Sequence, residues 1–203
     1  MMRVGVLASG SGSNFSALVE ALNVDGGPAR VELLVCNVPG AKVLQRAEAA
    51  HVETALIDHR TVPNREQFDE AVAQTLVDRQ IELVCLAGYM RLVSPAFLRR
   101  FPGKVINIHP ALLPAFPGLH AVRQAIDSGV RVAGCTVHFV DDGTDTGPII
   151  AQAAVPVLPG DDEATLAARI QLEEHRLYPA VVRAIARGAV KLEGRKVQLQ
   201  GPL

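Results

Sequence analysis

The chain has 203 residues, of which 49% are hydrophobic and 20% charged, as is typical of a globular protein with a buried core. Its formal net charge of −1 gives no electrostatic reason to expect nucleic acid or a membrane as a partner. The N-terminus does not resemble a secretory signal and no apolar stretch reaches the roughly 20 residues of a membrane span, so we expect a cytoplasmic protein.

Short apolar runs alternate with helical patterns through the first half of the chain. Strands are predicted over 3–8, 31–36, 52–57, 81–88 and 104–109, and helices over 14–23, 41–50, 65–79 and 94–101. Continuously apolar strands separated by helices indicate a mainly parallel sheet that is covered on both faces. This half therefore predicts a Rossmann-like, doubly wound α/β fold.

The second half has a different pattern. After a predicted helix over 121–128, two β-rich runs over 130–140 and 147–158 are separated only by the sequence DDGTDT. So short a link cannot hold a crossover helix, and the two strands are expected to pair antiparallel. The fold class predicted for the chain is thus α/β, with a mostly parallel mixed sheet that has antiparallel strands in its C-terminal part.

The C-terminal segment predicts a long helix followed by a hairpin. The run 161–188 is amphipathic with acidic residues at its start, and Pro179 within it should kink or split the helix. A hairpin is expected over 190–199, around Glu193 and Gly194. Because no repeat or linker interrupts the sequence, residues 1–203 are expected to form one domain.

The three cysteines, Cys36, Cys85 and Cys135, each lie in an apolar strand-like run. An odd number without paired spacing argues against a disulfide framework and suits a reducing compartment. We expect all three to be buried, free thiols.

The turn ASGSGSN (8–14) follows the first strand and opens the first helix. It departs from the dinucleotide fingerprint, because Phe15 replaces the third glycine and no acid ends the second strand. It also lacks the Gly-Lys-Ser/Thr of a Walker A loop. The turn fits a smaller anion, such as one phosphate monoester held by Gly12, Ser13 and Asn14. The alternative is a tight βα turn in which Ser13 or Asn14 caps the helix.

Asn107 and His109 are two residues apart at the end of a predicted strand, so their side chains share one face. Pro110 holds the backbone of His109 extended, and two further prolines stiffen the loop that follows. An amide donor beside an imidazole suits acyl transfer, because the amide can stabilise an oxyanion while the imidazole donates or shuttles a proton. The alternative is a structural histidine at a strand end.

A carboxylate partner for His109 is expected in VDDGTDTGP, where Asp141, Asp142 and Asp145 are the candidates. An acidic surface turn is the alternative. No GxSxG elbow is present, which argues against Ser-His-Asp chemistry. No HExxH or CxxC is present either, so no metal site is expected.

Four segments together resemble the folate-dependent formyltransferases: GSGSN at 10–14, NIHPALLP at 107–114, PGLH at 117–120 and DGTDTGPII at 142–150. The resemblance covers nearly the whole chain and implies the formyltransferase fold. It also implies formyl transfer from 10-formyltetrahydrofolate to the amine of glycinamide ribonucleotide, as a step of purine synthesis. A phosphate-binding half over 1–100 and a catalytic and folate-binding half over 101–203 are expected.

The resemblance further implies roles for individual residues. Asn107, His109 and Asp145 would be the catalytic trio, in which Asp145 keeps His109 charged and organises a water for proton transfer. Gly12, Ser13 and Asn14 would bind the phosphate of the ribonucleotide, and Glu174 its ribose. The folate would contact Arg65, Met90, Arg91, Leu92, Val93, Asn107, Asp141, Asp142, Gly143 and Thr144. The partners would be these two small molecules, and the protein would be a monomer or a homodimer.

Two positions depart from the family's pattern. Some members carry a lysine where this chain has Ala115, and others a basic residue where it has Gln171. A deformylase with the same trio is one alternative, although such enzymes usually carry an N-terminal regulatory domain that is not expected here. A non-catalytic nucleotide-binding module that uses only the turn at 8–14 is another. A methionyl-tRNA formyltransferase is not expected, because it needs an RNA-binding domain and a more basic surface.

Overall fold

The computed structural model describes all 203 residues, from Met1 to Leu203. The chain divides into two compact units, Met1–Asn107 and Ile108–Leu203. No helix in it combines the length and the apolar character that crossing a membrane requires.

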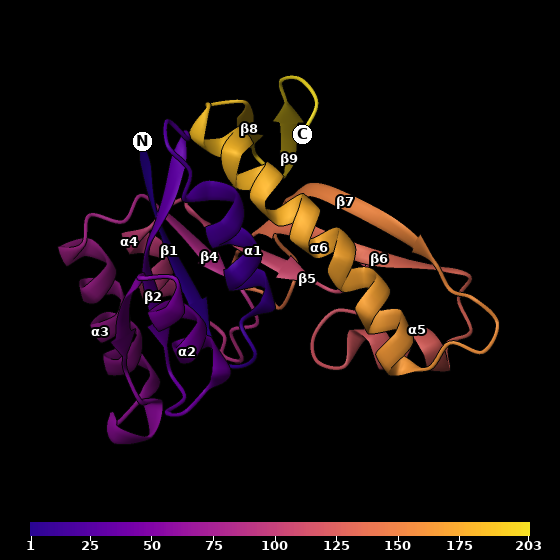
Figure 1. Cartoon of the computed structure of the whole chain (residues 1–203), viewed down its shortest axis with the longest axis horizontal. Helices are drawn as coiled ribbons and strands as arrows, with labels where there is room; N and C mark the ends of the chain where they lie inside the picture. The colour runs from indigo at the N-terminus through magenta and orange to yellow at the C-terminus, as the bar shows by residue number, and fades with distance from the viewer. The chain divides into compact units, whose positions relative to one another are not determined.

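The first unit consists of parallel strands joined by helices (Figure 1). β1 pairs in parallel with β2 and β4, β2 pairs with β3, and β4 pairs with β5. All strands and helices predicted in this half are present with small shifts at their ends, and only the short η1 was not predicted. In chain order the elements are β1 (Met2–Ala8), α1 (Ser13–Leu22), β2 (Ala29–Cys36), α2 (Lys42–Ala49), β3 (Glu53–Leu56), η1 (His59–Thr61), α3 (Arg65–Asp78), β4 (Leu83–Leu86), α4 (Pro95–Arg100) and β5 (Val105–His109).

The order of these strands explains why helices cover both faces. From β1 the chain steps outward to β2 and β3, then returns to β4 and β5 on the other side of β1. Crossovers between parallel strands are right-handed, so those that run in opposite directions place their helices on opposite faces. Accordingly, α1 packs with α2, and α3 packs with α4. The order reverses between β1 and β4, and the loops after these two strands lie where open α/β sheets bind ligands.

The core of this unit is built from the apolar strand residues. Val6, Leu34 and Val84 are fully buried. Gly5 allows α3 to pack closely on β1, because a Cβ at this position would lie only 2.7 Å from the Leu76 Cδ2 atom.

The second unit contains α5 (Ala121–Asp127), β6 (Val132–Phe139), β7 (Ile149–Pro156), α6 (Glu163–Ala186), β8 (Val190–Glu193) and β9 (Lys196–Leu199). β6 and β7 pair antiparallel, as predicted. The long helix α6 crosses this pair and packs on both strands (Figure 1). β8 and β9 form the expected C-terminal hairpin, in which Gly194 has a φ of 61°.

Helix α6 is continuous, so the expectation that Pro179 could split it is wrong. Proline removes one backbone donor, but Tyr178, Val181 and Val182 around it are fully buried. Packing of this apolar stripe outweighs the lost hydrogen bond. At the other end, a capping box between Asp162 and Thr165 fixes the first residue of the helix.

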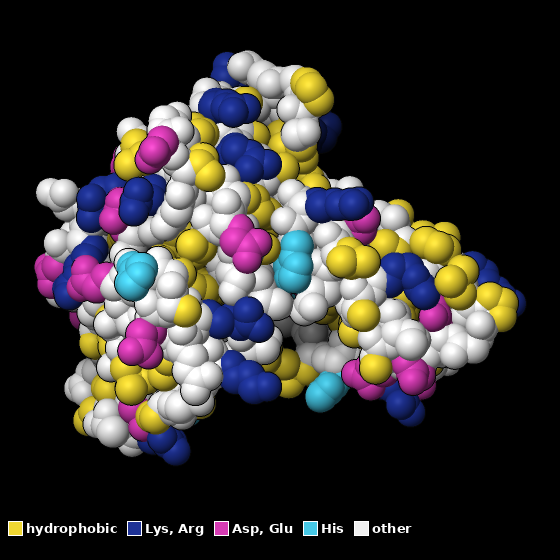
Figure 2. Space-filling model, in the orientation of Figure 1, with side chains coloured by type: hydrophobic (Ala, Val, Ile, Leu, Met, Phe, Trp, Pro, Cys, Tyr) yellow, Lys and Arg dark blue, Asp and Glu magenta, His cyan; other side chains and the backbone are white.

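The seven strands β1 to β7 form a mixed sheet in the order β3-β2-β1-β4-β5-β6-β7, mostly parallel and ending in the antiparallel β7. The predicted fold class is confirmed. All three cysteines are buried and free, as expected. On the face shown in Figure 2, acidic and basic side chains are interspersed rather than gathered by sign.

Candidate active site

His109 is the last residue of β5, and its imidazole is buried. The segment after it has no regular structure, contains a cis peptide between Leu113 and Pro114, and coils tightly through Phe116 and Gly118, with φ of 53° and 80°. This coil brings the chain back to the strand end. As a result, the carbonyl oxygen of Phe116 lies 2.8 Å from His109 Nε2.

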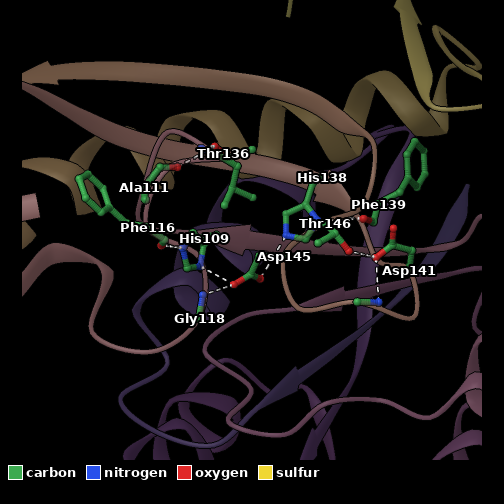
Figure 3. A network of polar contacts seen from close by, with 12 residues as sticks. His109, Ala111, Phe116, Gly118, Thr136, His138, Phe139, Asp141, Asp145 and Thr146 are labelled. Carbon is green, nitrogen blue, oxygen red and sulfur yellow. Dashed lines mark hydrogen bonds and ion pairs between the residues drawn. The ribbon is translucent and has the colours of Figure 1, made fainter. Parts of the chain in front are cut away.

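The Asp145 carboxylate lies between two imidazoles (Figure 3). Its Oδ2 atom is 3.3 Å from His109 Nδ1, and its Oδ1 atom is 3.6 Å from His138 Nε2. The Gly118 amide donates a hydrogen bond to Oδ2 at 2.8 Å. Of the three aspartates considered as partners for His109, Asp145 is therefore the one in contact with it.

Both ring nitrogens of His109 face oxygen atoms. Nε2 faces the Phe116 carbonyl, which can only accept, and Nδ1 faces the Asp145 carboxylate. An imidazole held between these two oxygens can donate a hydrogen bond or shuttle a proton, as general acid–base chemistry requires.

Asp145 is a fixed negative charge. Burial raises its pKa, but the His138 imidazole, the Gly118 amide and the charge of His109 together lower it more, and the pKa lies below its ordinary value. The residue has a φ of 55°, a left-handed conformation that aspartate tolerates better than most side chains. The carboxylate thus stays ionised at neutral pH, where it can hold a charged histidine.

Side chains of β6 and β7 hold the proline-rich segment after His109 through hydrogen bonds to its backbone. The Thr136 hydroxyl, fully buried, donates to the Ala111 carbonyl at 2.6 Å and accepts from the Leu113 amide at 3.0 Å. The Gln152 side chain donates to the Leu113 carbonyl at 2.8 Å and to the Thr136 hydroxyl at 3.0 Å. These bonds fix the path of the backbone that supports the imidazole of His109.

The loop 141–146 between β6 and β7 is closed by its own hydrogen bonds. The Asp141 carboxylate accepts from the Gly143 amide at 3.1 Å and from the Thr146 hydroxyl at 2.6 Å. Arg195 of the C-terminal hairpin donates to the Thr146 carbonyl at 2.5 Å and lies 3.6 Å from Asp141. Asp142, Gly143 and Thr144 are exposed at the tip of this loop.

In the first unit, the glycine turn leads into α1 through Gly12, which has a φ of 76° and is buried. Neither Ser13 nor Asn14 occupies the N-cap position, and no side chain caps the helix, so the capping alternative is wrong. At the start of the turn, the Ser9 hydroxyl donates to Asn37 Oδ1 at 2.6 Å and accepts from the Met90 amide at 2.9 Å. The loops after β1, β2 and β4 are thereby joined.

The segment Met90 to Val93 is held by α3. Arg65 donates to the Val93 carbonyl at 2.8 Å, and the Arg91 guanidinium lies 4.7 Å from the centre of the Phe68 ring. Met90 and Leu92 are exposed, with 66% and 59% of their surface accessible. The segment therefore presents apolar side chains from a fixed backbone.

The structure places the remaining predicted residues as follows. Asn107 is a half-buried residue of β5, and Glu174 is buried on α6. Burial and the negative charge of Glu174 raise the pKa of the Cys135 thiol on β6 to about 12. Ala115 and Gln171 are exposed.

Sequence reasoning missed two side chains of the site, His138 and Thr136. The two alternate on β6 and are both buried. Two polar residues at alternate positions of an otherwise apolar run are a signal that could have been noticed, because buried polar groups need partners.

Comparison with known proteins gives a consistent result. A family model described as formyl transferase matches residues 2–182. The phosphoribosylglycinamide formyltransferase of Bacillus subtilis (strain 168) is 47% identical over 185 residues, which are 91% of this chain and 95% of that protein. The crystal structure of glycinamide ribonucleotide transformylase 1 from Symbiobacterium toebii has a TM-score of 0.97 and 50% identity, covering 99% of this chain and 95% of that one.

Other relatives are much longer. The trifunctional purine biosynthetic protein adenosine-3 of Drosophila pseudoobscura pseudoobscura is 47% identical over 191 residues, which are 93% of this chain but only 14% of that protein. The family match extends from the first strand into α6 and includes His109 and Asp145. The chain belongs to the formyl transferase family.

Proposed function

We propose that the protein transfers a formyl group from 10-formyltetrahydrofolate to the amine of glycinamide ribonucleotide, in the de novo synthesis of purines leading to IMP. The products are formyl-glycinamide ribonucleotide and tetrahydrofolate. Similarity to the Bacillus subtilis enzyme over 95% of that protein's length supports this assignment. The observation that carries the chemistry is the His109 ring held between the Asp145 carboxylate and the Phe116 carbonyl.

The Phe116 carbonyl marks the direction in which His109 Nε2 donates. When the amine attacks the formyl carbon, the formyl oxygen gains negative charge and takes the place of this carbonyl at Nε2. Asn107, two residues earlier on the same side of β5, is the second donor. The bond between the formyl carbon and the folate nitrogen then breaks. The proton lost by the amine reaches that nitrogen through a water organised by Asp145.

Gly12, Ser13 and Asn14 bind the phosphate of the ribonucleotide. The absence of a side-chain cap on α1 supports this role, because amides at a helix N-terminus attract an anion. Glu174, a buried carboxylate on α6, accepts from the ribose hydroxyls.

The folate donates the formyl group and needs an apolar surface with backbone hydrogen bonds. The exposed Met90 and Leu92, on a backbone fixed by Arg65 and α3, fit this requirement. The assigned contacts are Arg65, Met90, Arg91, Leu92, Val93, Asn107, Asp141, Asp142, Gly143 and Thr144.

Residues 1–203 work as one domain, in which 1–100 hold the phosphate and 101–203 carry the catalytic and folate-binding groups. The protein acts on its two small-molecule substrates as a monomer or a homodimer. We assign it to the cytoplasm, where buried free cysteines are common.

The test is an absorbance assay of the folate product with the purified protein. We expect tetrahydrofolate to form only when glycinamide ribonucleotide is present. Equal rates without the ribonucleotide would identify a deformylase instead. Failure to bind folate, with ribonucleotide still bound, would leave a nucleotide-binding module.

A further inference from the structure

Helix α2 holds the glycine turn through two consecutive carbonyl groups. The Val43 amide donates to the Gly10 carbonyl at 3.1 Å, and the Arg46 Nε atom donates to the Ser11 carbonyl at 2.8 Å. Val43 and Arg46 are three residues apart, so they lie on the same side of α2. One face of this helix therefore fixes two successive peptide groups of the turn.

This anchoring determines where the amides of the turn point. In a planar trans peptide, the C=O and the following N–H point in opposite directions. Because the Gly10 and Ser11 carbonyls point toward α2, the amides of Ser11 and Gly12 point away from it. Neither amide donates a hydrogen bond within the chain. Successive N–H groups directed to one side are the arrangement that binds an anion.

The glycine turn packs so closely against α2 that its backbone has little room to move. A Cβ at Gly12 would lie 2.5 Å from Val43 Cγ2, and the φ of 76° at this position favours glycine. The turn therefore cannot shift toward α2, and Arg46 prevents the Ser11 peptide from rotating.

Arg46 also brings a positive charge to the turn. Its Nη1 atom donates to the Ser16 hydroxyl on α1 at 3.1 Å. No carboxylate forms an ion pair with it, in contrast to Arg3, Arg60 and Arg79 of the same unit. The guanidinium thus adds to the field of the α1 N-terminus, which favours an anion.

We propose that Arg46 is the positioning residue of the phosphate-binding turn: it aims the Gly12 amide and, through its charge, favours a phosphate dianion. This inference rests on the proposed function, because it assumes that the ribonucleotide phosphate binds at this turn. Arg46 acts through the Ser11 peptide and has no part in the transfer of the formyl group.

The experiment compares the wild type with Arg46→Ala, Arg46→Lys and the control Arg99→Ala, an exposed arginine on α4. For Arg46→Ala we expect the KM for the ribonucleotide to rise roughly tenfold or more, since the charge-assisted hydrogen bonds to Ser11 and Ser16 are both lost. The kcat and the KM for folate should stay within about twofold. Arg99→Ala should match the wild type throughout.

Titration with inorganic phosphate by calorimetry, without folate, tests the turn independently of the reaction. We expect wild type to bind phosphate and Arg46→Ala to bind it roughly tenfold more weakly. If the wild type binds phosphate but transfers no formyl group, the proposed function fails and this inference stands. Equal phosphate binding by the wild type and Arg46→Ala, or none by the wild type, would overturn it.

Arg46→Lys distinguishes the effect of the arginine's hydrogen bonds from the effect of its charge. Lysine keeps the charge but cannot reproduce the Nε donation to Ser11 together with the Nη1 donation to Ser16. We expect it to bind phosphate with an affinity between those of Arg46→Ala and the wild type. Wild-type affinity in Arg46→Lys would show that charge alone is sufficient and would overturn the positioning role. This variant also keeps the test decisive if Arg46→Ala does not fold.

Discussion

The Nδ1 atom of His109 lies 3.3 Å from the Asp145 carboxylate, although one residue precedes β6 in the sequence and the other follows it. His109 ends β5, whereas Asp145 belongs to the loop between β6 and β7. The contact between the two side chains therefore depends on how that loop is held. Both the chemistry and the stability of this region should respond to changes at Asp145.

Asp145→Asn should lower kcat by a factor of roughly 10² to 10⁴, the usual contribution of a positioned proton-transfer group. The amide keeps the size of the side chain but places no negative charge beside the His109 ring. The KM for the ribonucleotide should change little. Steady-state kinetics check this, with Asp127→Asn as the control, because Asp127 forms only an exposed pair with Arg123. Near-normal turnover in Asp145→Asn would contradict the assigned mechanism.

The lowered pKa of Asp145 predicts how stability depends on pH. The folded state binds this proton less readily than the unfolded state, so the carboxylate contributes stability above the unfolded pKa of about 3.9. That contribution is lost as the pH falls through the lower pKa of the folded protein. Urea unfolding of the wild type and Asp145→Asn from pH 7 to pH 3 measures it. The stability difference should be constant near neutral pH and shrink in acid; a difference that grows in acid would be incompatible with the lowered pKa.

His138→Asn should move the acid limb of the kcat profile to higher pH. The His138 imidazole helps to lower the pKa of Asp145, so without it this pKa rises and the carboxylate is protonated at a higher pH. A pH–rate profile of the variant measures the shift. His51→Asn is a matched control, because His51 is exposed and its φ of 54° suits asparagine. An unchanged acid limb in His138→Asn would rule out this role.

Local sequence patterns were sufficient to predict most of the fold. Apolar runs of strand length and their spacing predicted every strand of the sheet, and the short link DDGTDT (141–146) predicted the antiparallel pair. His109 was found because it ends a predicted strand and is followed by prolines. Asp145 was one of three candidate aspartates in the next loop, and the resemblance to the formyltransferases singled it out. The signals at His109 are features of the neighbouring residues alone, so no long-range contact had to be known there.

The parts that were missed depend on contacts between distant segments. His138 faces Asp145 only because the loop after β6 turns back with a left-handed residue. The sequence predicted a turn there, but it does not show which side chains the turn brings together. The continuity of α6 at Pro179 likewise depends on burial. Arg46 binds the carbonyl of Ser11, which is 35 residues away in the sequence. Sequence periodicity carries no information about such pairs.

Gly147→Ala should destabilise the protein and impair catalysis together. A Cβ at this position would overlap the carbonyl oxygen of Phe139. The amide of the same residue, Phe139, donates a hydrogen bond to the Pro148 carbonyl at 2.9 Å. The backbone therefore cannot move aside without breaking the end of the β6–β7 ladder. Asp145 lies two residues away and would lose its position between the two imidazoles.

The free energy of unfolding of Gly147→Ala should fall by about 3 kcal/mol or more, as expected for a backbone overlap in a buried site. The folded fraction should also have a reduced kcat. Gly103→Ala is the control, because Gly103 has a φ of 65° but nothing within 4 Å of its Cβ position. It should lose only about 1–2 kcal/mol from backbone conformation and keep its kcat. Denaturant unfolding and kinetics on both variants measure the comparison, and equal effects at the two glycines would show that the close approach to Phe139 is unimportant.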